Sequence, residues 1–337
     1  MKNNLLIQLF IVSIVMIVGL GGCNTFKTTN KNNDLIIYTS HPKEFSDPII
    51  SEFEKKTNIN VNIVKASTGE LLKNIEEEKT VPLGDVIWGG SVAALKSRTD
   101  FLEEYISKNE ENIYKDYRNS DGKITRFTIM PSVLIVNLDL VKNIKIDGFE
   151  DLLNSELKGK IAVVDPGKSS TAFESLTNQL YAMGNNNPDE GWPYIENFLE
   201  NTEKKMINSS SAVFNKVIDG EYTVGLTYEG ALKYISKGDP VKIVYPKEGI
   251  IANPDCVAII KGAEQIENAK KFIDFLTSKE VQTIVSEDLC RRSVRSDVQS
   301  EKFEDFNKLN IVKQDENWVL NNKQEIIKRY KNIIENQ

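Results

Sequence analysis

Runs of serine, threonine and glycine recur along the chain where a predicted strand is followed by a predicted helix. A helix N-terminus offers free backbone N–H groups and the positive end of the helix dipole, and side-chain hydroxyls add further donors. Such donors suit a phosphate, phosphonate, carboxylate or sulfate group. The runs are Thr39-Ser40, Ser67-Thr68-Gly69, Gly89-Gly90-Ser91, Ser169-Ser170-Thr171 and Ser209-Ser210-Ser211.

One serine or threonine at a helix start needs no ligand to explain it, because both residues are good N-caps. A run of three hydroxyls exceeds what a cap requires, and two such runs occur in the later part of the chain. In open α/β sheets, ligands bind beyond the carboxyl ends of the strands. The sequence therefore predicts a site for an anionic solute, formed by Ser40, Thr68, Gly90, Ser91, Ser169, Ser170, Thr171 and Ser210.

Three larger polar residues also lie at or just beyond the ends of predicted strands. His41 is the only histidine in the chain and would donate to the anion. Tyr228 and Glu229 would hold the other end of the ligand, an amine through Glu229 or hydroxyl groups through either residue. The plainer alternatives are that His41 braces a loop and that Tyr228 only packs.

The composition argues against an enzyme and against a nucleic-acid partner. The chain contains one histidine and no HExxH, GxSxG, Walker or CxxC motif, so the usual catalytic sets are missing. Its formal net charge is −7, whereas phosphate-backbone binding needs clustered lysine and arginine. We predict a non-catalytic protein without a cofactor, and an extracellular hydrolase is the alternative.

Strand-like and helix-like segments alternate in the first part of the chain. Residues 35–38 are a short apolar run of strand type, residues 61–64 and 84–88 are also predicted strands, and Phe45, Ile49 and Phe53 recur at helical spacing. Such alternation predicts a mostly parallel sheet with helices on its faces.

A long β-rich stretch, residues 123–139, is interrupted by Pro131, which cannot donate to a sheet ladder. A strand bent there can pass from one lobe to another, and residues 246–255 are predicted to cross back. The predicted fold class is therefore α/β, with two Rossmann-like lobes joined by crossing hinge strands. Lobe 1 comprises residues 35–130 and 251–290, lobe 2 comprises 131–250, and a helical tail comprises 291–337.

The N-terminal segment has the layout of a secretory signal. Lys2 precedes an apolar run from Leu5 to Leu20, and Gly21-Gly22-Cys23 follows. This ending resembles the lipobox of bacterial lipoproteins, so we expect residues 1–22 to be removed and Cys23 to be lipidated. Residues 23–34 are then a polar tether to the outer face of the cell membrane.

Several segments resemble one known family of receptors. They are IIYTSHPKEFSDPIISEFEKKTNINVNIVKASTGELL, GDVIWGGS, SSTAFESL, SSSAVFNKVIDGEYTVGLTYEGA and AKKFIDFLTSKEVQ. These are similar to the ferric-ion, thiamine, aminoethylphosphonate and sugar-phosphate branch of type II periplasmic-binding-protein-like receptors. The resemblance implies a ligand cleft between two lobes, hinge closure, and an ABC permease with its ATPase subunit as partners. A membrane sensor kinase is an alternative partner.

The resemblance leaves the ligand open. Ferric-ion members use a histidine after the first strand, an acidic residue and two adjacent tyrosines, and paired phenolates suit hard Fe(III). Here the alternative metal set is His41, Glu70 and Tyr228, but Glu229 stands where the second tyrosine would be. Thiamine or its phosphates would need aromatic walls, for which Trp88 and Tyr228 are candidates. A phosphonate or sugar phosphate is the favoured ligand because it matches the hydroxyl-rich helix starts.

Overall fold

The computed structural model describes residues 34–335, so the predicted signal segment, Cys23 and nearly all of the tether lie outside them. The strands are β1 (Leu35–Thr39), β2 (Val61–Lys65), β3 (Val86–Ser91), β4 (Thr125–Asn137), β5 (Ile161–Ala162), β6 (Val224–Tyr228), β7 (Val241–Val244), β8 (Ala252–Ile259) and β9 (Arg292–Ser293). The helices are α1 (Lys43–Thr57), α2 (Thr68–Glu77), α3 (Val92–Lys96), α4 (Leu138–Val141), α5 (Ser170–Met183), α6 (Trp192–Asn201), α7 (Ser210–Ile218), α8 (Ile266–Leu276), α9 (Lys279–Glu287) and α10 (Glu316–Glu335).

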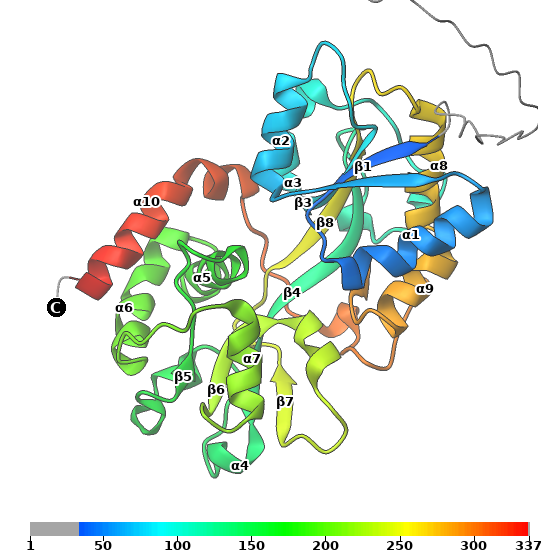
Figure 1. Cartoon of the computed structure of the whole chain (residues 1–337). Helices are drawn as coiled ribbons and strands as arrows, with labels where there is room; N and C mark the ends of the chain where they lie inside the picture. The colour runs from blue at the N-terminus through cyan, green and yellow to red at the C-terminus, as the bar shows by residue number, and fades with distance from the viewer. Residues whose placement is uncertain (1–33, 336–337) are drawn as a thin grey trace, which may run out of the picture. The chain divides into compact units, whose positions relative to one another are not determined.

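Two lobes share the long strand β4 (Figure 1). In the first lobe the strand order is β2-β1-β3-β8-β4, with β1 parallel to β2 and β3, and β9 pairs with the same part of β4. In the second lobe β4 pairs with β6 and β7, and β5 lies beside β6. The α/β fold with two lobes and crossing strands is therefore as the sequence predicted. The expected mostly parallel sheet is wrong, because only β1, β2 and β3 of the first lobe run parallel, whereas β8 runs antiparallel to β3 and to β4, and β9 runs antiparallel to β4.

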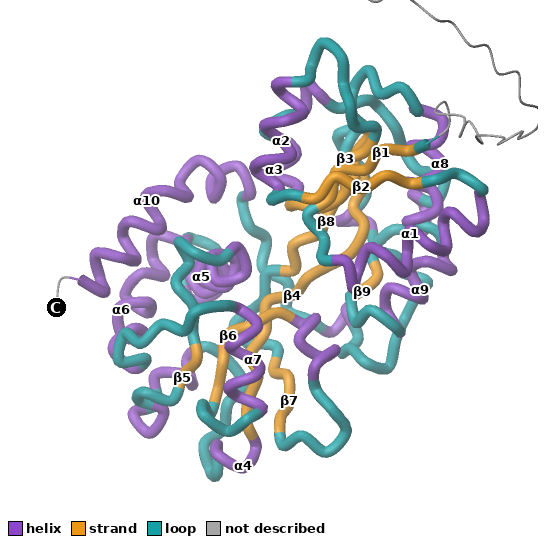
Figure 2. Tube along the Cα trace, viewed as in Figure 1, coloured by secondary structure: helices purple, strands orange, loops and turns teal. Residues whose placement is uncertain are grey.

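The change of lobe occurs at Pro131. The β4 strand pairs with β8 as far as Pro131 and with β6 from Ser132 onward. Proline has no N–H to give to either sheet, and the backbone N–H of Ser132 donates to the carbonyl of Ile251 at 3.0 Å. As β4 runs from one lobe into the other (Figure 2), it therefore changes its partner strand at a residue that gives no N–H to either sheet.

The first lobe forms because helix α1 buries one face against the sheet. Phe45, Ile49 and Phe53 lie on that face and pack around the fully buried Trp88. Asn58 ends the helix in the left-handed conformation, with φ of 54°.

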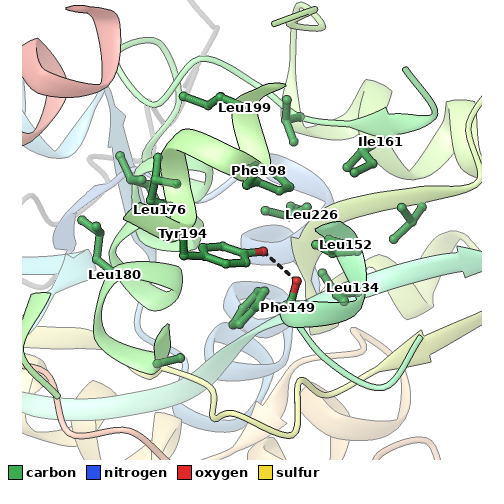
Figure 3. Packing of buried hydrophobic residues seen from close by; sticks show 14 of the residues in the cluster. Leu134, Phe149, Leu152, Ile161, Leu176, Leu180, Tyr194, Phe198, Leu199 and Leu226 are labelled. Carbon is green, nitrogen blue, oxygen red and sulfur yellow. Dashed lines mark hydrogen bonds between the residues drawn. The ribbon is translucent and has the colours of Figure 1, made fainter. Parts of the chain in front are cut away.

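The second lobe has a core of its own, built from α5, α6 and the strands beneath them (Figure 3). Leu176, Leu180 and Phe198 meet there, and the hydroxyl of Tyr194 donates to the carbonyl of Phe149 at 2.8 Å. The end of the chain joins this core, because Val319, Ile326 and Tyr330 of α10 are buried in it.

None of the helices in residues 34–335 combines the length and the apolar character that a bilayer crossing requires.

Candidate functional site

A cavity of about 660 Å³ lies between the two lobes. Six of the predicted ligand-binding residues line it: Ser40, His41, Thr68, Gly90, Ser91 and Ser170. The lining is completed by residues that include Ser67, Met130, Phe173, Glu174, Asn253, Asp255, Arg291, Glu316, Val319, Leu320 and Lys323. The cleft thus receives residues from both lobes, from the crossing strands and from the C-terminal helix.

The wall from the first lobe brings together Ser40 after β1, the start of α2 and the end of β3. The hydroxyl of Thr68 donates to Ser40 Oγ at 3.2 Å. Gly89 and Gly90 both have positive φ, 122° and 99°, which favours glycine. A Cβ on Gly90 would lie 2.6 Å from Cγ2 of Thr68, so a side chain there would push the end of β3 away from the start of α2.

His41 is held at the back of this wall by a carboxylate. Its Nε2 lies 2.8 Å from Oδ2 of Asp255, while Oδ1 of the same carboxylate accepts from the backbone N–H of Gly90 at 2.9 Å. The imidazole packs between Phe45 and Trp88, with ring centroids 4.7 and 4.8 Å away, and only 7% of His41 is exposed. Through Asp255, His41 is therefore connected to Gly90 at the end of β3.

The two serine runs of the second lobe meet each other, and only one residue of them faces the cleft. Ser169 caps α5 by accepting from the backbone of Ala172, and its Oγ lies 2.6 Å from Ser210 Oγ. Thr171 and Ser210 line a separate cavity of about 20 Å³. Ser170 is the residue of these runs that lines the cleft.

Glu229 forms its ion pair and its hydrogen bonds outside the cleft. Nε of Arg292 donates to its two carboxylate oxygens at 3.1 and 3.0 Å, and the hydroxyl of Tyr245 donates to Oε1 at 2.6 Å. Glu229 is 1% exposed, and its charge contributes, after burial, to raising the pKa of Tyr245. Because Arg292 is on β9 and Glu229 follows β6, this ion pair joins the two lobes.

Arg291 forms the floor of the cleft beside that pair. Its guanidinium lies 5.3 Å from the ring of Phe45 and 5.4 Å from the ring of Tyr228, and it contacts the sulfur of Met130. Within residues 34–335 no carboxylate lies within ion-pair distance of it. Tyr228 thus supports a cation of the cleft from behind and is not itself among the lining residues.

Five charged residues of the lining were not among the predicted site residues: Glu174, Asp255, Arg291, Glu316 and Lys323. Glu174 lines the cleft, and burial, followed by the charge of Asp255, raises its pKa to about 7. Nζ of Lys323 lies 5.0 Å from the centre of the Phe173 ring. A sequence signal for Lys323 exists, because it falls four residues after Val319 and three before Ile326, on the buried face of α10.

The residues of the alternative metal set do not come together as ligands. The carboxylate of Glu70 accepts from the backbone N–H and the hydroxyl of Ser67 at 3.0 and 2.7 Å, and these bonds lower its pKa. Burial raises the pKa of Tyr228, which favours the phenol over the phenolate. Among the described residues no group of three or more His, Cys, Asp or Glu side chains is arranged to hold a metal. Cys256 and Cys290 are both buried free thiols.

Known proteins resemble the chain in sequence and in fold. A putative 2-aminoethylphosphonate-binding periplasmic protein of Salmonella typhimurium is 26% identical, over 73% of each chain. The periplasmic binding protein AfuA of Actinobacillus pleuropneumoniae, solved with fructose-6-phosphate, superposes with a TM-score of 0.74 at 25% identity, covering 89% of this chain and 98% of that one. A two-component system protein that mediates signal transduction superposes with a TM-score of 0.72 at 31% identity, covering 84% and 95%.

The family described as bacterial extracellular solute-binding protein matches residues 49–310, a span that includes most of both lobes and most residues of the cleft. The family places the protein outside the cytoplasm, where such proteins bind small molecules for transport. The chain belongs to the bacterial extracellular solute-binding protein family.

Proposed function

We propose that this protein captures a small solute bearing a phosphonate or phosphate group and delivers it to an ABC permease driven by its ATPase subunit. The observation that carries the proposal is Arg291, a cation in the cleft without a carboxylate partner in the described chain. Ser40, Thr68 and Ser170, which carry hydroxyl groups, line the same cleft.

Arg291 lacks the carboxylate partner that other arginines of the protein have. Arg126, Arg292 and Arg295 each pair with a carboxylate, at Asp121, Glu229 and Asp297 respectively. A partly buried guanidinium without a partner is costly, and an oxyanion of the ligand would supply that partner. Arginine matches the planar, bidentate geometry of phosphate and phosphonate oxygens.

The hydroxyl-bearing helix starts add the remaining donors. Thr68 and Ser170 are the first residues of α2 and α5, where backbone N–H groups are free and the dipole is positive. The two helices belong to opposite lobes, so an anion between them would be contacted from both sides. The names of the aminoethylphosphonate-binding relative and the fructose-6-phosphate complex support a ligand of this class.

Two other ligands remain alternatives that fit this cleft less well. Ferric ion would need hard anionic donors, whereas Glu229 is bound to Arg292 and Glu70 is bound to Ser67. Thiamine would need an aromatic wall, but Trp88 is fully buried among the rings of the first lobe.

A thermal-shift screen of the protein without its lipid tests the proposal. A ligand that binds only the folded state raises the melting temperature. We expect 2-aminoethylphosphonate or a sugar phosphate to raise it more than thiamine species or ferric citrate do, and Arg291→Met to abolish the shift. A response to ferric citrate alone would support the metal alternative, and a response to none of the phosphorus compounds would contradict the proposal.

We also propose that Cys23, which lies outside the described residues, anchors the protein to the cell membrane through lipid. Cys23→Ala should then move the protein from the membrane fraction to the culture medium or the periplasm. A variant that stays in the membrane fraction as fully as the wild type would contradict this anchor.

A sensory role is a second candidate, and the two-component system protein at 31% identity favours it. A receptor of this kind would pass its closed form to a membrane kinase. Deleting the gene separates the two roles. Loss of solute uptake supports transport, whereas normal uptake with loss of solute-induced transcription supports sensing.

A further inference from the structure

The C-terminal helix α10 reaches the cleft from outside the segment that matches the family, which ends at residue 310. Val319, Ile326 and Tyr330 anchor it in the core of the second lobe. Its first turn lies beside α3 of the first lobe (Figure 1), and the side chain of Glu316 at that turn lines the cleft. The helix therefore spans from one lobe to the other along one side of the cleft.

Lys323 points from this helix into the cleft. Its Nζ lies 5.0 Å from the ring centre of Phe173, and no carboxylate in residues 34–335 is within ion-pair distance of it. Lys328 on the same helix is exposed and lies 3.7 Å from its carboxylate partner, Glu325. Lys323 is only partly buried, so its ammonium group remains accessible to an anion that enters the cleft.

The residues around Lys323 indicate that its missing partner is an anionic ligand. Glu174 lies near enough for both Lys323 and Arg291 to act on its charge, and Ser170 at the start of α5 lines the same cleft. Arg291 and Lys323 therefore both lie near the carboxyl group of Glu174. Neither forms an ion pair with it, so each can still bind an anionic ligand.

We propose that Lys323 is a ligand-binding residue, and that α10 supplies it as part of the wall that selects the solute by its negative charge. This inference rests on the proposed function. Lys323 contacts an oxygen of the anionic group from the second lobe, while Arg291 contacts that group from the floor of the cleft. The specificity of this receptor is then set in part by α10, which lies outside the residues 49–310 that match the family.

Titration calorimetry of three variants tests the assignment, with 2-aminoethylphosphonate and fructose 6-phosphate as probes. Lys323→Met keeps the apolar stem and removes the charge, so we expect affinity for the bound probe to fall about tenfold or more. Lys323→Arg keeps the charge and should stay within about threefold of the wild type. Lys328→Met removes a charge from the same helix away from the cleft and should leave affinity unchanged.

The results distinguish a failure of the role of Lys323 from a failure of the proposed function. Equal affinity in the wild type and Lys323→Met, or an equal loss in Lys323→Arg and Lys323→Met, would overturn the role of the Lys323 charge and leave the proposed function standing. No binding of any phosphorus compound by the wild type would overturn both. Thermal melts of the free variants, expected to match the wild type, ensure that a loss of affinity is not a loss of fold.

Discussion

Glu174 is a carboxyl group whose protonation should affect the stability of the protein. Burial, followed by the charge of Asp255, raises its pKa from 4.5 to about 7. Between these values the folded protein keeps a proton that the unfolded chain has released, so this group lowers stability as pH rises through that window. Glu174→Gln removes the titration. We expect the melting temperature of the variant, relative to wild type, to increase from about pH 5 to about pH 8.

The matched control for this prediction is Glu196→Gln on the exposed face of α6, which should show the same difference at both pH values. Melts followed by circular dichroism give the comparison. A Glu174→Gln difference that does not change with pH would show that the carboxyl group of Glu174 ionises as freely in the folded protein as in the unfolded chain.

The ion pair between Glu229 and Arg292 should contribute to stability more than any ion pair at the surface. Both residues are buried, so Glu229→Gln leaves a guanidinium in the interior without a counter-charge. Breaking a buried pair in this way costs about 3–5 kcal/mol. Urea unfolding should show that loss for Glu229→Gln and almost none for Glu267→Gln, which breaks the exposed pair with Lys270. A loss below about 1 kcal/mol would mean that water reaches Arg292.

At the scale of elements, the end of β3, which leads directly into α3, depends on Gly89 and Gly90. Gly90→Ala combines an unfavourable positive φ with a methyl group 2.6 Å from Thr68. The backbone conformation alone costs about 1–2 kcal/mol, and the contact should also displace the start of α2 and weaken ligand binding. Gly220→Ala is the control, because Gly220 has φ of 75° and nothing within 4 Å of the added Cβ.

Thermal melts and titrations of both glycine variants separate the two effects. We expect both variants to lose stability and only Gly90→Ala to lose affinity for the solute. Equal behaviour of the two would show that the close approach of Thr68 to Gly90 has no part in shaping the cleft.

Local sequence signals predicted these elements well, because strand periodicity and N-cap residues act over a few residues. The break in β4 at Pro131 and the helix starts at Thr68 and Ser170 are examples. The side-chain partners could not be predicted in the same way. Glu229 meets Arg292 across 63 positions, and Lys323 reaches the cleft only because α10 folds back on the second lobe. Such contacts depend on tertiary packing that no short window of sequence contains.

At the scale of the whole molecule, the ion pair between Glu229 and Arg292 lies at the junction about which the lobes can rotate. On β4, Ile129 pairs with Arg292 and Ser132 pairs with Tyr228, the residue before Glu229, so the ion pair flanks the change of lobe at Pro131. The lobes are joined there by backbone pairing and by a buried ion pair, and they are separated by the cleft beyond it. Rotation about this junction would open and close the cleft without breaking either core.

Ligand binding should therefore make the molecule more compact. A solute held by Thr68 in one lobe and Ser170 in the other makes all of its contacts only when the lobes approach, so binding shifts the population toward the closed form. Small-angle scattering should show a smaller radius of gyration with saturating ligand, whereas Arg291→Met at the same ligand concentration should keep the dimensions of the free protein. Identical dimensions of the free and the bound wild type would mean that the solute binds one lobe alone, and the donors of the opposite lobe would then have no part in recognition.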